Sequence, residues 1–315
     1  MRRCLITMEN IDGPGNYSAR ALKLLNPKLD DLKDLPYSQE KQLIITKEQI
    51  DKISIQGVQP KFSAKLNAPG QIFELVEKYG TYIIKPQNPE WHEFPENEAF
   101  TMHMAALYKI NTPLTGLIKC SDATLSYFIK RFDRLGRGKK CLVEDFSQLA
   151  ELDRKTKYNY SVENVIKLIE DYCTFPRIEL PKFFRLLIFN FLFGNEDMHL
   201  KNYSIMTNAK GVVQLAPAYD LLNSIAAYRY YDKDYSKIEQ SALSIKGKKR
   251  KLKLDDFIDL ASRMQLQQKV VSESFRHLHK CSQQALAILH SSFMSEKMKQ
   301  VYEEVLKRHE TILFK

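Results

Sequence analysis

The sequence predicts an α+β protein with two lobes, a small strand-rich N-terminal lobe and a larger helical C-terminal lobe. Short strand-like runs dominate from about residue 53 to residue 131, with Gly and Pro at the turns between them. After about residue 142, apolar residues recur mainly at helical spacing. No repeat or low-complexity linker separates the two patterns. We place the boundary between residues 135 and 136, which gives lobes of 1–135 and 136–315.

Five strands and one helix are expected in the N-terminal lobe. The strand ranges are 62–66, 72–76, 81–85, 114–118 and 125–131. The helix interrupts these strands after the third one. It begins near Pro95 and Glu96, since proline and acidic residues are favoured in the first turn of a helix. The apolar residues at helical spacing behind them are Phe100, Met104, Leu107 and Tyr108.

The C-terminal lobe is expected to be built around one buried helix. Its apolar residues cover most of the helix circumference, as in a core helix. These residues are Phe183, Phe184, Leu187, Ile188, Phe191 and Leu192. The helix ends at Gly194, two short strands follow at 203–206 and 212–215, and helical patterns resume from Asp255 to the C-terminus. The Tyr-rich run 228–235 is expected to be a polar surface loop rather than a platform for stacked bases.

Composition excludes several classes of protein. The chain has 315 residues, of which 44% are hydrophobic and 27% charged, as in a globular protein. Its longest nearly apolar run, 186–193, falls far short of the ~20 residues that a membrane-spanning helix needs. The N-terminus lacks the apolar region and cleavage site of a signal peptide. We therefore expect a cytoplasmic protein with no membrane contact.

The five cysteines indicate reduced thiols. Their number is odd and they form no Cys-x-x-Cys pair, which fits neither a disulfide framework nor a zinc ribbon. His277, His279 and Cys281 are neighbours in a helical pattern, where residues two apart point away from each other. A metal site is therefore not expected among them.

The net charge of +10 would attract phosphate, nucleic acid or acidic protein surfaces, and charge alone does not choose among these. Part of this charge lies in the basic run 246–253. This run could contact DNA phosphates. A solvated basic hairpin is the favoured interpretation.

The strongest chemical signal is the segment 194–202, directly behind the buried helix. Its Asp197 is followed five residues later by Asn202, the Asp-x-x-x-x-Asn spacing of a kinase catalytic loop. Phosphoryl transfer needs a carboxylate to deprotonate the acceptor and oxygen ligands for Mg²⁺. We expect Asp197 to be the base and Asn202 a Mg²⁺ ligand. His199 and Lys201 would shape the loop and neutralise developing phosphoryl charge.

A second acid, Asp220, follows the predicted strand pair. A kinase places its metal-binding Asp at this point, and Mg²⁺ favours carboxylate and phosphate oxygens. Either motif alone could be a solvated turn rich in Asn. Both motifs in this order, behind a buried helix, favour an ATP-dependent kinase.

Three lysine and acid positions in the N-terminal lobe are compatible with a nucleotide site. The loop 54–61 has one glycine, and its backbone amides or the Lys61 ammonium could hold phosphates. Lys85 closes a predicted strand, where kinases place the lysine that contacts the α- and β-phosphates. The alternative is an ordinary strand-end lysine. For Glu98, an ordinary helix residue is favoured over an ion-pair partner of Lys85.

Together these motifs resemble the HipA family, the serine/threonine-kinase toxins of bacterial toxin–antitoxin systems. The motifs are Ser-x-Gln-Gly-Val-Gln-x-Lys (54–61), Ile-Lys-Pro (84–86), Pro-Glu-Asn-Glu (95–98), Ile-Lys-Arg-Phe-Asp-Arg (129–134), Gly-Asn-x-Asp-x-His-x-Lys-Asn (194–202) and Pro-Ala-Tyr-Asp-Leu (217–221). The match runs in order from about Ser54 to Asp256. The resemblance implies a bilobal protein-kinase-like fold with ATP and Mg²⁺ as cofactors.

The resemblance also implies roles for individual residues. Lys85 would bind ATP, and Ser54 falls on the inhibitory autophosphorylation position, where a phosphate would add about −1.5 to −2 charges. The residues implied to cover the ATP phosphates are Gln56, Gly57, Val58, Gln59 and Lys61. Those of the adenine-binding hinge are Lys130, Arg131 and Phe132. The nucleotide and metal site would be completed by His199, Asn202, Tyr219 and Asp220, with Asn202 and Asp220 as metal ligands.

Only about fifty residues precede Ser54, so the chain resembles the short HipT form of the family. That form implies a separate HipS-like small antitoxin, a HipB-like DNA-binding protein and contact with DNA only through their complex. It implies an aminoacyl-tRNA synthetase substrate, with the tryptophanyl enzyme favoured, and hence inhibition of translation. The alternatives are a small-molecule or lipid kinase and a catalytically silent co-repressor that binds an antitoxin.

Overall fold

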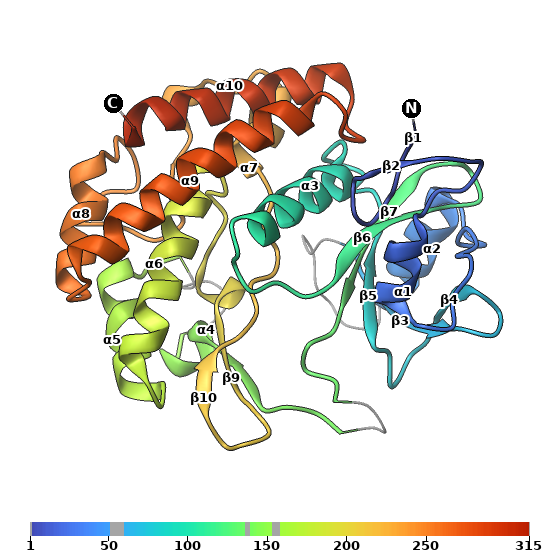
Figure 1. Cartoon of the computed structure of the whole chain (residues 1–315), viewed down its shortest axis with the longest axis horizontal. Helices are drawn as coiled ribbons and strands as arrows, with labels where there is room; N and C mark the ends of the chain where they lie inside the picture. The colour runs from blue at the N-terminus through green and yellow to red at the C-terminus, as the bar shows by residue number, and fades with distance from the viewer. Residues whose placement is uncertain (1, 51–59, 136–138, 153–157, 315) are drawn as a thin grey trace. The chain divides into compact units, whose positions relative to one another are not determined.

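The computed structural model describes residues 2–50, 60–135, 139–152 and 158–314 (Figure 1). The chain divides into two compact units. The first comprises Met1–His103, Pro113–Lys139 and Ser291–Met294, and the second comprises Met104–Thr112, Lys140–His290 and Ser295–Lys315. The boundary placed between residues 135 and 136 stays a prediction.

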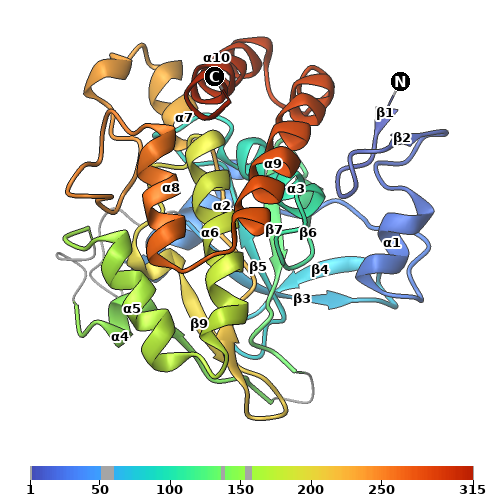
Figure 2. The same cartoon turned by 60° about the vertical axis from the view of Figure 1, so that its left-hand side comes forward.

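The first unit contains a five-stranded antiparallel sheet in the order β4-β3-β5-β7-β6 (Figure 2). The strands are β3 (Phe62–Asn67), β4 (Ile72–Leu75), β5 (Tyr82–Lys85), β6 (Thr115–Lys119) and β7 (Leu125–Lys130). The five predicted strands are therefore confirmed, with ends shifted by a single residue. The rings of Phe73, Tyr82 and Phe128 pack on one face, where the Phe73 centroid lies 4.9 Å from Tyr82 and 5.2 Å from Phe128. These aromatic pairs across strands fix the register of the sheet.

Helix α3 (Phe94–Leu107) confirms the predicted helix, and the division between the two units falls within it. Its apolar side chains, such as Phe100 and Met104, are fully buried. No helix or strand was predicted ahead of the sheet. The structure has β1 (Arg2–Arg3), β2 (Asn10–Ile11), α1 (Ala19–Leu25) and α2 (Gln39–Ile50) there.

The second unit is mainly helical. Its helices are α4 (Phe146–Leu149), α5 (Val162–Tyr172), α6 (Pro176–Leu192), α7 (Ser224–Tyr230), α8 (Leu254–Arg263), α9 (Gln268–Leu289) and α10 (Glu296–Leu313). Helix α6 is the predicted core helix, buried along most of its length and packed against α5, α9 and α10. A three-stranded sheet joins β10 (Val213–Leu215), β9 (Ser204–Thr207) and β8 (Val143–Asp145), in that order. The sequence predicted the first two of these strands and missed β8.

One prediction in this unit is wrong for part of its range. The Tyr-rich run 228–235 was expected to be a surface loop, but Tyr228 and Tyr230 belong to α7, while residues 231–234 are exposed and lie outside any helix. The Asn223 side chain caps this helix by accepting a hydrogen bond from the Ala226 amide at 2.8 Å. Burial of Ile225 and Ala226 on one side then holds the helix in the core.

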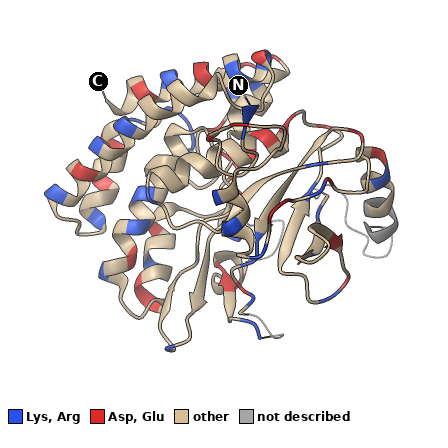
Figure 3. Cartoon of the chain, turned by 45° about the vertical axis from the view of Figure 1, so that its right-hand side comes forward, with Lys and Arg blue, Asp and Glu red and all other residues tan. Residues whose placement is uncertain are grey.

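Charged side chains of both signs are interspersed along the long C-terminal helices α9 and α10 (Figure 3). Helix α9 contains His277 and His279, as the helical pattern predicted. Within the described ranges, no group of three or more His, Cys, Asp and Glu residues is arranged to hold a metal ion. The described helices also include none with the length and apolar content that crossing a bilayer requires.

Candidate active site

Gly194 ends the core helix and starts the candidate catalytic loop. Its φ of +66° lies in the left-handed region, which favours glycine. A Cβ atom at this position would lie 2.5 Å from Asn223 Oδ1 and 2.7 Å from Val305 Cγ1. Both backbone conformation and space therefore require glycine where the chain leaves α6.

Asn195 ties the candidate catalytic loop to the segment that carries Asp220. Its amide donates to the Asn190 carbonyl of α6 at 2.9 Å. Its side-chain Nδ2 donates to Asn190 Oδ1 at 3.1 Å and to the Asp220 carbonyl at 3.5 Å. The two segments in which the sequence predicted catalytic and metal-binding residues are thus joined by a buried side chain.

Asp197 and Asn202 lie at opposite ends of one short turn. The Asn202 Nδ2 donates to the Asp197 carbonyl at 3.1 Å, and the His199 amide donates to the same carbonyl at 2.8 Å. A single 3-10 turn, Leu200–Asn202, lies between them. The hydrogen bond uses Nδ2 and leaves Oδ1 of the Asn202 amide able to act as an acceptor or a ligand.

The Asp197 carboxylate receives a short hydrogen bond that the sequence did not predict. The Tyr158 hydroxyl donates to Asp197 Oδ1 at 2.5 Å. The Tyr158 ring meets the His199 ring edge-on, with centroids 5.0 Å apart. Burial and the neighbouring carboxylate raise the pKa of Tyr158. The phenol therefore stays protonated and fixes the orientation of the carboxylate.

Glu196, the residue before Asp197, points into the protein. Its amide donates to the Ser224 hydroxyl at 2.9 Å. Burial raises the pKa of Glu196 to about 7, and the adjacent Asp197 charge contributes to the rise. Burial and the Glu196 carboxyl in turn raise the pKa of Tyr228, with which Glu196 shares a hydrogen bond. Of the two consecutive acids, Asp197 is the partly exposed one.

Tyr219 and Asp220 follow β10. The Tyr219 hydroxyl donates to the Lys201 carbonyl at 2.9 Å and shares a 2.6 Å hydrogen bond with the Ser204 hydroxyl. It therefore braces the end of the catalytic turn. Asp220 has a φ of +55°, a left-handed conformation that costs a residue with a side chain about 1–3 kcal/mol and tends to occur at functional sites.

The side chains of Asn202 and Asp220 fit a magnesium ion. Both side chains supply hard oxygen donors. In Asn202, Nδ2 is used in the hydrogen bond to the Asp197 carbonyl, and Oδ1 is the atom that could bind the ion. Mg²⁺ takes one or two protein oxygens and completes its coordination with phosphate and water. A cluster of three or more acidic or imidazole ligands is therefore not required.

In the first unit, Lys85 and Glu98 form a buried ion pair. Lys85 Nζ lies 2.7 Å from Glu98 Oε1. The strand register places Lys85 opposite Tyr127, and Nζ lies 5.4 Å from the centroid of that ring. The sequence favoured an ordinary helix residue at Glu98, and this was wrong. A partner of opposite charge lets a lysine ammonium remain charged when buried.

The other predicted residues of the first unit lie on its surface or at the end of a strand. Lys61 and Lys130 are exposed, while Arg131 and Phe132 are partly buried. Arg131 donates two hydrogen bonds to Asp133, at 2.9 and 2.6 Å. Burial would raise the pKa of Asp133, but Arg131 and Arg134 outweigh it and lower this pKa. The guanidinium is thereby fixed beside the end of β7.

Five predicted residues of the loop 54–61 lie outside the described residues. They are Ser54, Gln56, Gly57, Val58 and Gln59. In the second unit, by contrast, the structure joins the segments that contain Asp197, His199, Lys201, Asn202, Tyr219 and Asp220. Their catalytic and binding roles stay predictions.

Comparison with known proteins finds relatives over most of the chain. A family described as HipA-like C-terminal domain matches residues 53–286. A protein of Haemophilus influenzae named as a kinase is 27% identical over 223 residues, which cover 67% of this chain and 64% of that protein. The serine/threonine-protein kinase toxin HipA of Shewanella oneidensis is 24% identical over 191 residues, covering 55% of this chain and 43% of the toxin. The chain therefore spans less than two thirds of each relative.

Two solved structures share the fold. HipA of Shewanella oneidensis, solved with HipB and operator DNA, has a TM-score of 0.65 at 19% identity, covering 90% of this chain and 73% of that chain. The proinflammatory kinase CtkA of Helicobacter pylori has a TM-score of 0.55 at 17% identity, covering 79% of this chain and 92% of that chain. The predicted kinase-like fold class is thereby confirmed.

Proposed function

This chain belongs to the family of HipA-like C-terminal domains, and from that premise we propose that it is an ATP-dependent serine/threonine-protein kinase. The observation that carries the proposal is the Asp197 carboxylate, held by Tyr158 at one end of a turn whose other end presents Asn202. A base and a metal ligand at this spacing are the parts that phosphoryl transfer requires.

Each residue of the site would have a distinct role in this reaction. Asp197 would accept the proton of the acceptor hydroxyl through Oδ2, since Oδ1 is bonded to Tyr158. Asn202 and Asp220 would hold Mg²⁺, and the bound ion would neutralise the negative charge of the phosphates. Lys85, held by Glu98, would contact the nucleotide phosphates. His199 and Lys201 would flank the transferred phosphoryl group.

The finer proposal is a toxin of a bacterial toxin–antitoxin system, of the short HipT-like form. Its substrate would be an aminoacyl-tRNA synthetase, with the tryptophanyl enzyme favoured, and its phosphorylation would inhibit translation. A HipB-like DNA-binding protein and a HipS-like small antitoxin would be its partners, and DNA would be reached only through their complex. The family resemblance and the solved complex of the Shewanella oneidensis relative support this proposal.

The substrate is tested by γ-phosphate transfer to a panel of purified aminoacyl-tRNA synthetases in the presence of ATP and Mg²⁺. We expect phosphoserine or phosphothreonine on the tryptophanyl enzyme, and loss of transfer when a chelator removes Mg²⁺. Mass spectrometry of the same reaction should also find phosphate on Ser54 of this chain. Phosphorylation of a metabolite or lipid with none on protein would replace the proposal by a small-molecule kinase. ATP binding without any transfer would indicate a silent co-repressor.

Replacement of Tyr158 by Phe is expected to lower kcat by about 10- to 150-fold, because one hydrogen bond to a charged group is worth about 1.5–3 kcal/mol. The ring and its contact with His199 remain, so the change removes only the O–H that orients the Asp197 carboxylate. The KM for ATP should stay constant. Steady-state kinetics separates the two parameters, and a rise in KM with unchanged kcat would assign Tyr158 to nucleotide binding instead.

A further inference from the structure

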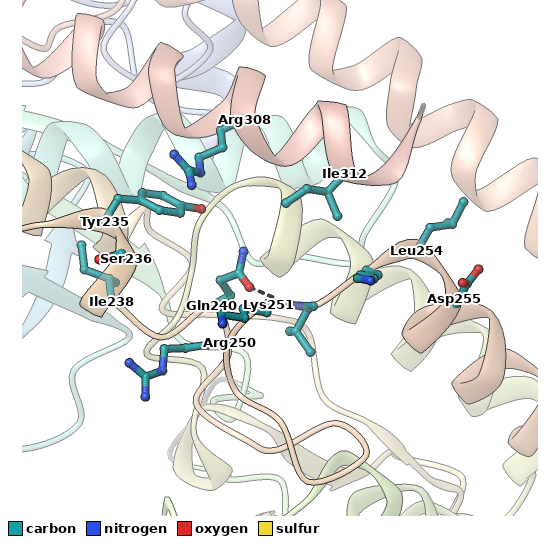
Figure 4. A pocket seen from close by; sticks show the side chains of 12 residues that line it. Tyr235, Ser236, Ile238, Gln240, Arg250, Lys251, Leu254, Asp255, Arg308 and Ile312 are labelled. Atoms are coloured by element: carbon teal, nitrogen blue, oxygen red, sulfur yellow. Dashed lines mark hydrogen bonds between the residues drawn. The ribbon is translucent and has the colours of Figure 1, made fainter.

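A large pocket lies in the second unit outside the candidate catalytic loop (Figure 4). It has a volume of about 1070 Å³ and is lined by the segments 235–240 and 250–255 and by Arg308 and Ile312 of α10. Protein pockets that bind ligands commonly have volumes of ~300–1,000 Å³. This pocket therefore lies at the upper end of the usual range, and the chemistry of its lining decides which ligand it suits.

The cations that line the pocket differ from the neighbouring cations in their ion-pair partners. Lys248 and Lys249 are paired with Asp256 and Glu239, at 2.6 and 3.5 Å. Lys246 is paired with Asp259.

In contrast, Arg250, Lys251 and Lys253 line the pocket and are exposed, and none has an ion-pair partner within the described part of the chain. Arg308 adds a fourth cation, against the single carboxylate of Asp255. This part of the basic run is exposed to solvent, as expected from the sequence, and is thus available to an external anion.

The pocket also offers an aliphatic wall. Ile238, Leu252 and Ile312 line it, and Leu252 is 2% exposed. Gln240 is buried at its base, where Oε1 accepts a hydrogen bond from the Leu252 amide at 3.0 Å (Figure 4). A ligand that fills the pocket must therefore combine negative charge with an aliphatic group.

A second hydrogen bond of Gln240 connects this pocket with the candidate catalytic loop. The Gln240 backbone amide donates to the Lys249 carbonyl at 2.8 Å. Gln240 itself and Arg250, the residue after Lys249, line the pocket. Lys249 itself pairs with Glu239 and places Nζ 5.9 Å from the Tyr158 ring. The lining of the pocket is therefore linked, through the backbone and side chain of Lys249, to the tyrosine that holds Asp197.

A nucleic acid fits the pocket less well than a peptide. Binding of single strands relies on aromatic faces on which bases stack. Tyr235 is the aromatic residue of the lining, and its ring already contacts the Arg308 guanidinium at 3.9 Å and, edge-on, His309. The aliphatic wall instead suits leucine or isoleucine side chains.

We propose that this pocket is a docking site for an acidic segment with aliphatic side chains in the protein substrate. The proposal rests on the proposed function, because a docking site beside the catalytic loop serves a kinase that acts on proteins. Its test is a binding measurement without ATP, so its outcome does not depend on catalysis.

The probe is a short fluorescein-labelled peptide of alternating Glu and Leu, measured by fluorescence anisotropy at ~0.15 M salt, where the Debye length is about 8 Å. The double variant Arg250→Glu/Lys251→Glu should weaken its Kd by about tenfold or more, as expected for reversal of contacting charges. The control Lys269→Glu/Arg276→Glu makes the same change of net charge on α9 and should weaken it by about threefold at most, because distant surface charges are screened. A peptide of alternating Glu and Ser should bind more weakly, and Ile312→Ser should abolish that difference.

Three results would overturn the docking site. They are equal losses in the two double variants, equal binding of the Glu–Leu and Glu–Ser peptides, and pocket-dependent binding of a thymidine oligonucleotide with none of the peptide. If the Glu–Leu peptide binds as expected but no protein is phosphorylated, the proposed kinase function fails and the peptide site remains. If proteins are phosphorylated and the pocket variant leaves both peptide binding and KM unchanged, only the docking site fails.

Discussion

Replacement of Asp197 by Asn is expected to lower kcat for phosphoryl transfer by about 10²–10⁴, the usual contribution of general base catalysis. Asparagine keeps the size of the side chain, and its Oδ1 can still accept the hydrogen bond from Tyr158. What it loses is the ability to take the proton of the acceptor hydroxyl. The nucleotide Kd should stay within about twofold, because the proposed metal ligands Asn202 and Asp220 are unchanged.

Transfer of a labelled γ-phosphate gives kcat, and calorimetry with a non-hydrolysable ATP analogue gives the Kd. Asp171→Asn, which makes the same chemical change on the exposed end of α5, is the matched control and should retain full activity. An Asp197→Asn protein with the kcat of the wild type would show that the base lies elsewhere. A variant that loses nucleotide binding together with activity would assign Asp197 to the metal instead.

Hydrophobic patterns and turn residues predicted the strands of the first sheet and the core of helix α6. The strands of the first sheet are short runs bounded by Gly and Pro, and their ends were found to within a single residue. Helix α6 is apolar on nearly every side of its second half, so its core residues 183–192 were found, but its start at Pro176 was not predicted. Helix α7 was missed because its tyrosines are mixed with charged residues. The signal that could have found it is Asn223 followed by Ser224, an N-cap residue at the start of a buried apolar stretch.

The site was predictable where its chemistry depends on spacing and not where it depends on tertiary contact. Asp197 and Asn202 are five residues apart and lie in one turn, so their association follows from the chain itself. Tyr158 lies 39 positions before Asp197, in a segment without periodicity, and no pattern pointed to it. The contact of Glu98 with Lys85 likewise depends on how α3 packs on β5.

Removal of the Glu98 carboxylate by Glu98→Ala is expected to destabilise the first unit by about 3–5 kcal/mol, because the Lys85 charge would stay buried without its counterion. The two side chains are 2% and 7% exposed, so water cannot replace the lost partner without local unfolding. The single tryptophan, Trp91, belongs to the first unit. Its fluorescence during urea denaturation therefore measures the free energy of unfolding of this unit.

The double variant Lys85→Met/Glu98→Leu separates stability from function. Apolar side chains of similar size can replace a buried ion pair with little loss of stability, or with a gain of about 1–4 kcal/mol. We therefore expect the double variant to unfold near the wild-type urea concentration and yet to bind ATP weakly, because it lacks the ammonium that would contact the phosphates. Recovery of both stability and ATP affinity would mean that Lys85 serves only the packing of α3 on β5. If the double variant is as unstable as Glu98→Ala, the cost lies in packing and not in the unpaired charge.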